Sequence, residues 1–418
     1  MIRSFLKILT FLCLVQSVSP ADAASLYLGI DVLEARGFDV LEGKRIGLLT
    51  HPAGVNSKGI WTRDILARAE NVNLVKLFGP EHGLYGTEKA NDPIKDKKDP
   101  ATGLPVYSLY GQYRTPTPAM LQGLDAMVID LQDIGTRSYT YISSMRLTMQ
   151  ACFENGVEVI ILDRPNPLGG LKVDGPILDP ELRSYVGAFP VPYLHGLTIG
   201  ELAMMAKDQV GWLEIPRDNR VKGKLTIVPM RGWKRSMTWG ETRLRWIPTS
   251  PLISSPAAVL GYAMTGLGTE LNGFQHGYGT PHPFRLLRHK GIYADDLMRH
   301  LATIPHMGLR FEKRTVSNQQ GKPYEGVYTH LDDWNAIMPV EFSFHMMILA
   351  CRIEGGNPYA DASENAIGLF KKHMGDPAWW KEISTRGADA RLDRFLRHWR
   401  KENQAFVQKS RKYWLYPP

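Results

Sequence analysis

Polar side chains capable of acid-base or ligand chemistry follow several short apolar runs of this 418-residue chain. The runs cover residues 45–50, 72–78, 126–130 and 157–163, and each has the composition of a strand that is buried on both faces. In an open parallel sheet the loops at the carboxyl ends of the strands converge, so side chains at these ends share one crevice. The candidates at the strand ends, and at one later polar turn, are His51, Glu81, His82, Asp130, Gln132, Asp133, Asp163, Arg164, Asn166 and His195.

The Glu81-His82 pair carries the strongest signal for chemistry. Gly79, Gly83 and Gly86 let the backbone bend tightly around it, and neither residue of the pair is a favoured turn former. Hydrolysis of an acetal needs a carboxyl group that protonates the leaving oxygen, while a second carboxylate or the substrate's own acetamido group stabilises the oxocarbenium-like centre. An apolar turn raises the pKa of a carboxyl group, which makes Glu81 our candidate acid. Its possible partners are Asp130, Asp133 and Asp163, and sugar rings could stack on Tyr85, Tyr107, Tyr110, Tyr139 and Tyr141.

The sequence lacks the signatures of other catalytic chemistries. Imidazole and carboxylate groups of His51, Glu81, His82, Asp130 and His195 could hold a metal ion, but the chain has no H-E-x-x-H or comparable spacing. It has no G-x-S-x-G elbow of a serine hydrolase, and no glycine-rich phosphate loop follows the first apolar run. We therefore predict a site without a metal ion or other cofactor, and a sheet that binds no dinucleotide.

The elements that must position these residues alternate along the first half of the chain. Helices are expected between and after the apolar runs, at 60–70, 140–155 and 199–210. This alternation predicts an α/β fold, with a Rossmann-like, mostly parallel sheet domain at 25–250 and a second, smaller mixed α/β domain at 251–418. The polar stretch 87–118 interrupts the pattern, and we expect it to form a binding loop, a lid or a solvated excursion.

The first 23 residues have the pattern of a secretory signal peptide. Arg3 and Lys7 precede a short apolar run, and Ala21-Asp22-Ala23 has the small-x-small form of a cleavage site. The run is too short to cross a hydrocarbon core of about 30 Å as a stable helix. We therefore predict a protein secreted across the inner membrane to the periplasm, without stable membrane insertion. The rival interpretation is an uncleaved N-terminal anchor.

Charge and cysteine content exclude other classes of protein. The 50 Lys+Arg and 42 Asp+Glu residues give a net charge of +8, but no zinc-finger, RNA-recognition or helix-turn-helix signature accompanies them, so we predict no nucleic-acid partner. A mild positive field suits an anionic extracellular polymer such as the bacterial cell wall. Beyond the signal only Cys152 and Cys351 remain, which is no disulfide framework, and Cys152 lies in a helical apolar pattern that predicts a core position.

Six motifs occur in order along the chain: GPEHG (79–83), TGLPVYSLYG (102–111), DLQDIGTRSYTYIS (130–143), DRPNPLGG (163–170), VDGPIL (173–178) and HGLTIGELA (195–203). Together they closely resemble the exo-β-N-acetylmuramidase family, which is the NamZ-type family or glycoside hydrolase family 171. Motifs that extend over about half of the chain are far more specific than any single short pattern.

The resemblance implies an active site between a Rossmann-like N-terminal domain and a smaller C-terminal domain. It also implies release of N-acetylmuramic acid from the non-reducing end of peptidoglycan fragments, with Glu81 as the catalytic carboxylate. An arginine such as Arg137 or Arg164 would pair with the lactyl carboxylate of muramic acid, or else brace the turns through a bridge to an aspartate. The further catalytic groups would be His82, Asp130 and Asp163, and the substrate-binding groups His51, Gln132, Arg137, Tyr139, Arg164, Asn166 and His195.

The second half of the chain departs from the family pattern. Where the family carries S-E-G-R-G-T before Pro-Phe, residues 275–280 read Q-H-G-Y-G-T. His276 and Tyr278 thus stand where a glutamate and an arginine are usual, and both are candidate substrate-binding residues. Either the substrate differs, as a muramic acid derivative without a free carboxylate would, or the protein binds sugar without efficient turnover.

Three hypotheses for the function follow. The leading one is a secreted glycosidase of the exo-muramidase type that acts on peptidoglycan-derived sugars in cell-wall turnover or recycling. The alternative is a non-catalytic or weakly catalytic cell-wall sugar-binding protein on the same fold, whose binding would survive the change Glu81→Gln. The third is a metal-dependent hydrolase, which a chelator would inactivate.

Overall fold

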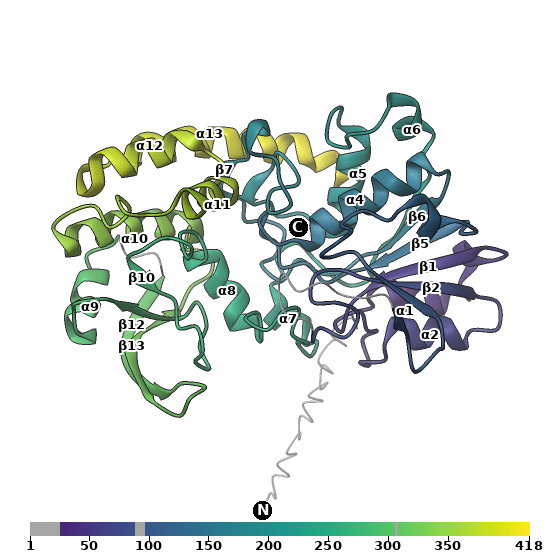
Figure 1. Cartoon of the computed structure of the whole chain (residues 1–418), viewed down its shortest axis with the longest axis horizontal. Helices are drawn as coiled ribbons and strands as arrows, with labels where there is room; N and C mark the ends of the chain where they lie inside the picture. The colour runs from purple at the N-terminus through teal and green to yellow at the C-terminus, as the bar shows by residue number, and fades with distance from the viewer. Residues whose placement is uncertain (1–25, 88–96, 306–307) are drawn as a thin grey trace, which may run out of the picture.

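The computed structural model describes residues 26–87, 97–305 and 308–418. Two bodies lie side by side in this part of the chain, a larger one built mostly from the first half of the sequence and a smaller one from the second half (Figure 1). The signal peptide predicted at 1–23 lies outside the described residues. Among the residues that are described, no helix is both long enough and apolar enough to span a membrane.

A mostly parallel sheet forms the centre of the larger body. Its strands are β1 (Arg45–Thr50), β2 (Asn73–Gly79), β3 (Lys97–Lys98), β4 (Pro105–Ser108), β5 (Ala126–Asp130), β6 (Glu158–Leu162) and β9 (Leu225–Val228). They lie in the order β3-β4-β2-β1-β5-β6-β9, and every neighbouring pair is parallel except β3 and β4. The four apolar runs form β1, β2, β5 and β6, so the predicted fold class is confirmed.

Helices cover both faces of this sheet. They are α1 (Gly29–Ala35) and α2 (Thr62–Arg68) on one face, and α4 (Tyr141–Glu154) and α5 (Ile199–Asp208) on the other. Successive residues of β5 point to opposite faces: Met127 and Ile129 pack with α4 and α5, whereas Ala126 and Val128 pack with α1 and α2. This two-sided burial is the reason the strand sequences are continuously apolar. Cys152 of α4 lies in the core, as predicted.

The stretch 87–118 contains strands that the sequence did not predict. Residues 88–96 lie outside the described part, but β4 extends the sheet beyond β2, with Val106 opposite Leu77. A strand of four residues that begins with Pro105 is too short to show an apolar period, and proline is tolerated at the first position of a strand. Part of the expected loop is therefore a strand of the sheet, because hydrogen bonding to β2 determines the conformation of residues 105–108.

The smaller body has an antiparallel sheet covered by helices. Its strands are β10 (Phe274–Gln275), β11 (Leu286–His289), β12 (Leu309–Ser317) and β13 (Pro323–Leu331), in the order β10-β11-β13-β12. The predicted mixture of helix and strand in this region is thus confirmed. Its helices are α8 (Pro256–Thr265), α9 (Ala294–Leu301), α10 (Pro339–Glu354), α11 (Glu364–Met374), α12 (Pro377–Arg386) and α13 (Leu392–Ser410), and short elements elsewhere are α3 (Pro118–Leu121), α6 (Arg217–Lys222), α7 (Trp239–Thr242), β7 (Asp174–Ile177) and β8 (Pro192–Leu194).

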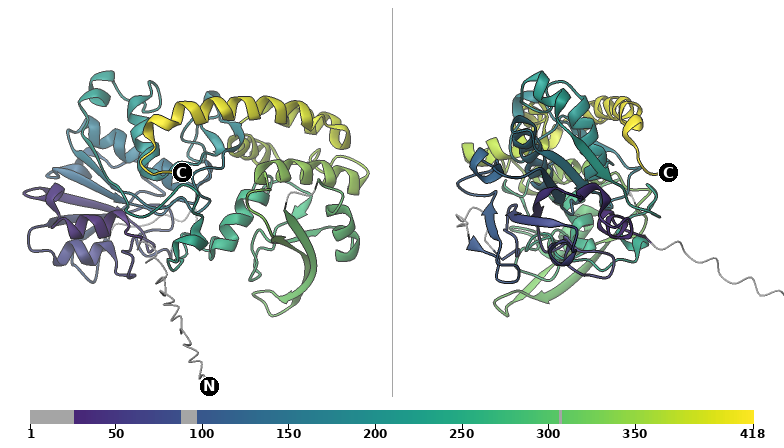
Figure 2. Two further views of the ribbon diagram at one scale, coloured as in Figure 1. Left: turned by 180° about the vertical axis from the view of Figure 1, so that it is seen from behind. Right: turned by 90° about the vertical axis from the view of Figure 1, so that its right-hand side faces the viewer.

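The C-terminal segment returns to the larger body and joins the two. Helix α13 runs along one side of both bodies (Figure 2). Near its end Phe406, and beyond it Tyr413, enter the core formed by α4 and α5. Asn403 of α13 donates a hydrogen bond from Nδ2 to the carbonyl of Gly175 in β7, with a length of 3.0 Å. The two bodies are therefore held in a fixed relation by buried contacts rather than by a linker alone.

Candidate active site

The turn after β2 presents Glu81 on a backbone that only particular residues permit. A Cβ atom on Gly79 would lie 2.6 Å from the backbone nitrogen of Leu84, and Gly83 has a φ of +73°. His82 also adopts a positive φ, of 69°, although it has a side chain. A positive φ is uncommon for such a residue and persists only where surrounding contacts impose it. The predicted tight turn is therefore present, and it is strained at the residue next to the glutamate.

Glu81 lies among tyrosines. Its Oε2 accepts a hydrogen bond of 2.7 Å from Thr140 Oγ1, just before α4. Burial raises the pKa of four phenols, and the negative charge of Glu81 adds to the effect, which places the carboxylate close to each of them. We refer to these residues as the tyrosine cluster: Tyr139, Tyr141, Tyr185 and Tyr262. The sequence singled out Tyr139 and Tyr141 but not the other two.

Arg114 brings a positive charge to the tyrosine cluster. Its guanidinium carbon lies 4.4 Å from the ring centroid of Tyr185 and 5.6 Å from that of Tyr110. The arginine itself is exposed to solvent. The sequence analysis missed this residue, because an arginine in a polar stretch without periodicity resembles any solvated side chain.

His51 is buried and uncharged beside the turn. Its Nε2 accepts a hydrogen bond of 3.0 Å from the backbone nitrogen of Gln132, and its ring meets Tyr141 edge-on at 4.7 Å. Burial lowers the pKa of His51 well below its usual value, and the charges of Arg164 and His82 lower it further. Because Nε2 is an acceptor, the proton of the neutral ring lies on Nδ1, which has no hydrogen-bond partner among the described residues.

Asp130 and Arg164 are bound to each other rather than available to a ligand. Both side chains are buried, and the guanidinium donates to the two carboxylate oxygens at 2.5 and 2.9 Å. Asp130 also accepts from Thr62 Oγ1, and Arg164 donates to the carbonyl of Val55. In contrast to the sequence prediction of a catalytic and a substrate-binding residue, this pair braces the ends of β5 and β6.

Asp163 and Asn166 also have structural partners. Asp163 is fully buried and accepts hydrogen bonds from Thr198 Oγ1, the backbone nitrogen of Gly200 and Tyr416 Oη, at 2.7, 2.8 and 2.5 Å. Asn166 is buried and satisfies nearby backbone groups. Asp163 therefore anchors the first turn of α5 and the C-terminal tail, and hydrogen bonds within the protein occupy both of its carboxylate oxygens, in contrast to the sequence prediction of a catalytic role. The side chain of Asn166, predicted to bind substrate, likewise bonds to the backbone.

Arg137 joins the two bodies instead of facing a substrate. The residue is 0% exposed, and its guanidinium donates at 2.6 to 2.8 Å to four backbone carbonyls. Burial lowers its pKa to about 9, which leaves it charged at neutral pH. Its donors are therefore not available to the lactyl carboxylate for which the sequence suggested them. The carbonyls belong to Pro176 and Val191 in the larger body and to His373 and Met374 in α11.

Asp133 is the remaining carboxyl group at the end of β5. Its Oδ2 accepts from the backbone nitrogen of Gly135 at 2.7 Å, and its Oδ1 has no partner in the described part of the chain. Burial raises the pKa of Asp133 to about 7, and its charge, like that of Glu81, acts on Tyr139. His195 Nε2 lies 4.0 Å from Asp133, but burial lowers the pKa of this histidine to about 3, so the contact is not an ion pair.

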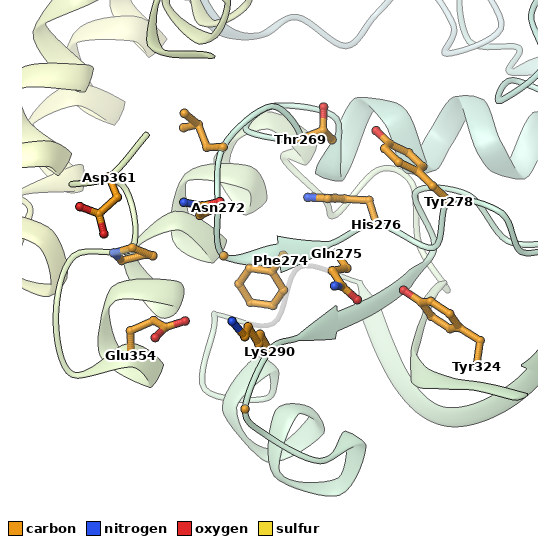
Figure 3. Close-up of a pocket in the computed structure, with 14 residues that line it drawn as sticks. Thr269, Asn272, Phe274, Gln275, His276, Tyr278, Lys290, Tyr324, Glu354 and Asp361 are labelled. Atoms are coloured by element: carbon orange, nitrogen blue, oxygen red, sulfur yellow. The ribbon is translucent and has the colours of Figure 1, made fainter. Parts of the chain in front are cut away.

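Gln132 and the last two predicted residues lie in other places. Gln132 donates to the carbonyls of Asp133 and Pro165, and it lines a cavity of about 90 Å³. His276 and Tyr278 line a pocket of about 920 Å³ in the smaller body (Figure 3). The structure thus brings Glu81, His82, His51, Tyr139 and Asp133 into one neighbourhood, whereas His276 and Tyr278 lie at a pocket of the smaller body.

These features define an α/β protein with a carboxylate-bearing, tyrosine-rich site at the carboxyl ends of its parallel strands. Within the described residues no group of three or more His, Cys, Asp or Glu side chains is arranged to hold a metal ion. Tyrosine rings beside carboxyl groups suit the binding of a sugar, since the ring faces stack on C–H groups and the polar atoms bind hydroxyls.

The chain belongs to the NamZ exo-β-N-acetylmuramidase family and is therefore a glycosidase. The model of the N-terminal domain of that family matches residues 46–257, and the model of its C-terminal domain matches residues 260–416. Both halves of the chain are thus covered, in spite of the departure at 275–280.

Characterised and solved relatives agree with this assignment. The peptidoglycan β-N-acetylmuramidase NamZ of Bacillus subtilis (strain 168) is 36% identical over 394 residues, which are 93% of this chain and 91% of that protein. A crystal structure of a DUF1343 family protein from Bacteroides fragilis NCTC 9343 is similar with a TM-score of 0.85 and 38% identity, covering 94% of this chain and 99% of its own. A second DUF1343 structure from the same strain has a TM-score of 0.70 at 26% identity, with the same coverage.

The raised pKa of Asp133 predicts a pH-dependent stability. The folded protein keeps this carboxyl protonated up to about pH 7, whereas the unfolded chain ionises near pH 4, so stability falls as the pH rises between these values. At about 1.4 kcal/mol per pKa unit, the loss is on the order of 2–4 kcal/mol. The change Asp133→Asn should remove it, and urea unfolding at pH 4 and pH 8 measures the free energy in each state.

The variant should be more stable than the parent at pH 8 and about equal to it at pH 4. Asp218→Asn is the matched control, because that side chain is 80% exposed and should leave the pH profile unchanged. Parallel profiles for the parent and Asp133→Asn would show that Asp133 is ionised in the folded protein.

Proposed function

We propose that this protein is an exo-acting glycosidase that removes β-linked N-acetylmuramic acid from the non-reducing end of peptidoglycan fragments. The observation that carries the proposal is the position of Glu81, held by Thr140 on a strained turn within the tyrosine cluster. The relative from Bacillus subtilis, named a peptidoglycan β-N-acetylmuramidase, supports the same substrate class.

Asp133 and Glu81 have different surroundings and therefore different roles in the proposed reaction. Asp133 keeps its proton to about pH 7, which suits a general acid that protonates the leaving glycosidic oxygen. Glu81 is partly exposed and lies where it can face the anomeric carbon and stabilise the positive charge that develops there. A water molecule then adds to that carbon, and its proton restores the acid. Burial raises the pKa of Tyr139 and the charges of both groups raise it further, so the two carboxyl groups belong to one electrostatic neighbourhood.

Arg114 supplies the cation that muramic acid requires. The lactyl ether of this sugar carries a carboxylate, which an arginine can bind through two parallel hydrogen bonds. Arg137 and Arg164 have their donors bound inside the protein. Arg114 is exposed, and Tyr185 beneath it also senses the charge of Glu81.

Export and a role in cell-wall turnover or recycling belong to the same proposal. The basic residues Arg3 and Lys7, the apolar run and the Ala21-Asp22-Ala23 pattern support secretion to the periplasm. Expression of the full chain in a Gram-negative host, followed by N-terminal sequencing of the periplasmic fraction, should find a protein that starts at Ala24. A full-length protein retained with the membrane would instead identify an uncleaved anchor.

The proposed roles of Glu81 and Asp133 predict different responses to the leaving group. Asp133→Asn should lower kcat by about 100-fold on wall glycan, but by less than about 10-fold on a dinitrophenyl β-muramide, whose leaving group needs no proton. Glu81→Gln should lower kcat by about 1000-fold on both substrates. Steady-state release of sugar and chromophore measures the rates, with circular dichroism to verify folding.

If the dinitrophenyl substrate restores kcat in Glu81→Gln but not in Asp133→Asn, then Glu81 is the general acid and Asp133 is the group that stabilises the positive charge. A parent protein that binds wall sugar and hydrolyses neither substrate would establish the sugar-binding alternative.

Arg114 should determine the preference for muramic acid. Arg114→Ala should lower the ratio of kcat/KM for a chromogenic β-muramide to that for the matching β-N-acetylglucosaminide by about 10-fold, because only the first carries the lactyl carboxylate. Arg114→Lys should recover part of the ratio, since it keeps the charge without the planar fork. Arg217→Ala is the control, because Arg217 is an exposed arginine on α6. An unchanged ratio in Arg114→Ala would place the lactyl group elsewhere.

A further inference from the structure

A large pocket lies in the smaller body. It has a volume of about 920 Å³, near the upper end of the range of roughly 300–1,000 Å³ that is typical of small-molecule sites. Its walls come from the segment 269–278, the turn at 290–291, the start of β13 and the segment 354–361 (Figure 3). The polar groups that line it include Asn272, Gln275, His276, Tyr278 and Tyr324.

The walls of this pocket are fastened in place. Asn357 donates from Nδ2 to the carbonyl of Ser384 at 2.6 Å, and Tyr359 donates from its hydroxyl to the carbonyl of Met347 at 3.0 Å. On the opposite wall, a Cβ atom on Gly277 would lie 2.6 Å from the carbonyl oxygen of His282, so the chain passes there without room to shift. A ligand would therefore meet a preformed surface.

His276 is the buried polar group of the pocket that lacks a partner. It is 6% exposed, and its Nδ1 has no hydrogen-bond partner among the described residues. Its ring extends from the end of β10 toward Asn272, into the space that the lining residues enclose (Figure 3). Burial lowers the pKa of His276 to about 4, so the ring is neutral and can offer a hydrogen bond to an uncharged hydroxyl or amide.

A short chain of aromatic rings connects the pocket to the surroundings of Glu81. Tyr278 meets Phe284 edge-on at 5.3 Å, and Phe284 meets Tyr262 edge-on at 5.1 Å. Tyr262 belongs to the tyrosine cluster that senses the charge of Glu81, and its hydroxyl lies 2.9 Å from Ser138 Oγ in the larger body. Two ring contacts therefore link the pocket to the tyrosine cluster, on the side of the smaller body.

The charges at the pocket disfavour an anionic ligand. Two acids, Glu354 and Asp361, and one base, Lys290, line it. Glu270 lies nearby, since its negative charge acts on both His276 and Tyr278. A muramic acid residue, with its lactyl carboxylate, would be repelled here. The neutral sugar that alternates with muramic acid in peptidoglycan carries only hydroxyl and acetamido groups, which match the amides and phenols of the lining.

We propose that this pocket binds the leaving side of the glycan, a neutral N-acetylhexosamine unit, through Gln275, His276 and the exposed ring of Tyr278. The inference rests on the proposed function, because it assigns the remainder of the same substrate to a second subsite. His276 and Tyr278 are polar and uncharged, so they can offer hydrogen bonds to the hydroxyl and acetamido groups of a neutral ring.

The test compares two substrates that share the sugar to be released. One is a chromogenic β-N-acetylmuramide, and the other is the disaccharide N-acetylmuramyl-β-1,4-N-acetylglucosamine. Gln275→Ala and His276→Ala in the full chain should each lower the ratio of kcat/KM for the disaccharide to that for the chromogenic substrate by about 10-fold. Gln320→Ala, an exposed glutamine outside the pocket, should leave the ratio unchanged. Gln275 is also exposed, so its variant tests the pocket even where a change at buried His276 prevents folding.

An unchanged ratio in both pocket variants would overturn the inference, whether the two kcat/KM values stay as they are or fall equally. If the parent hydrolyses neither substrate, the proposed function fails, and calorimetry with N,N′-diacetylchitobiose decides on the pocket separately. If N,N′-diacetylchitobiose binds and Gln275→Ala weakens the binding, the result supports a neutral-sugar site. Absence of binding at millimolar concentration refutes such a site. Binding of a wall stem tetrapeptide in place of the sugar would refute it as well, in favour of a peptide site.

Discussion

The buried ion pair between Asp130 and Arg164 is the contact on which the arrangement of the site depends. It joins the ends of β5 and β6, which are neighbouring strands of the sheet, and it is fully enclosed. Charges can remain in such a place only when each has a partner and hydrogen bonds for its other atoms, which Thr62 and Val55 supply here. With these two strand ends fixed, the loops that follow them have a rigid base on which to place Asp133 and the start of α4.

Asp130 and Asp163, at the strand ends, are bound to other groups of the protein and stabilise the fold. Glu81 differs from them. Asp163 holds Thr198 and Tyr416, so that it secures both α5 and the C-terminal tail. Glu81 instead accepts one hydroxyl from Thr140 and remains partly exposed on a turn whose backbone is strained at His82. Asp130 and Asp163 thus serve stability, whereas Glu81 at the aromatic cluster and Asp133, whose Oδ1 has no partner among the described residues, are left for chemistry.

The elements of the larger body could be predicted from sequence because burial on both faces of a parallel sheet imposes continuous apolar runs. The site could be predicted only in part. An aspartate or arginine at a strand end has the same spacing whether it faces a ligand or a buried partner, so the strand pattern could not show that Arg137 binds four carbonyls while Arg114 stands free of the core. Strand β4 and the pocket in the smaller body depend on pairing and on contacts between distant segments, which leave no local period.

The arginine at the tyrosine cluster is opposite in charge to most of the charged groups at the pocket of the smaller body. The chain carries a net charge of +8, yet the charged groups that line the large pocket are two acids and one base, whereas an exposed arginine, Arg114, lies at the tyrosine cluster. A glycan whose terminal sugar is anionic and whose next sugar is neutral would be oriented by this asymmetry, since the reverse placement puts a carboxylate beside Glu354 and Asp361. Orientation of this kind would favour the anionic sugar at the site of cleavage through charge alone.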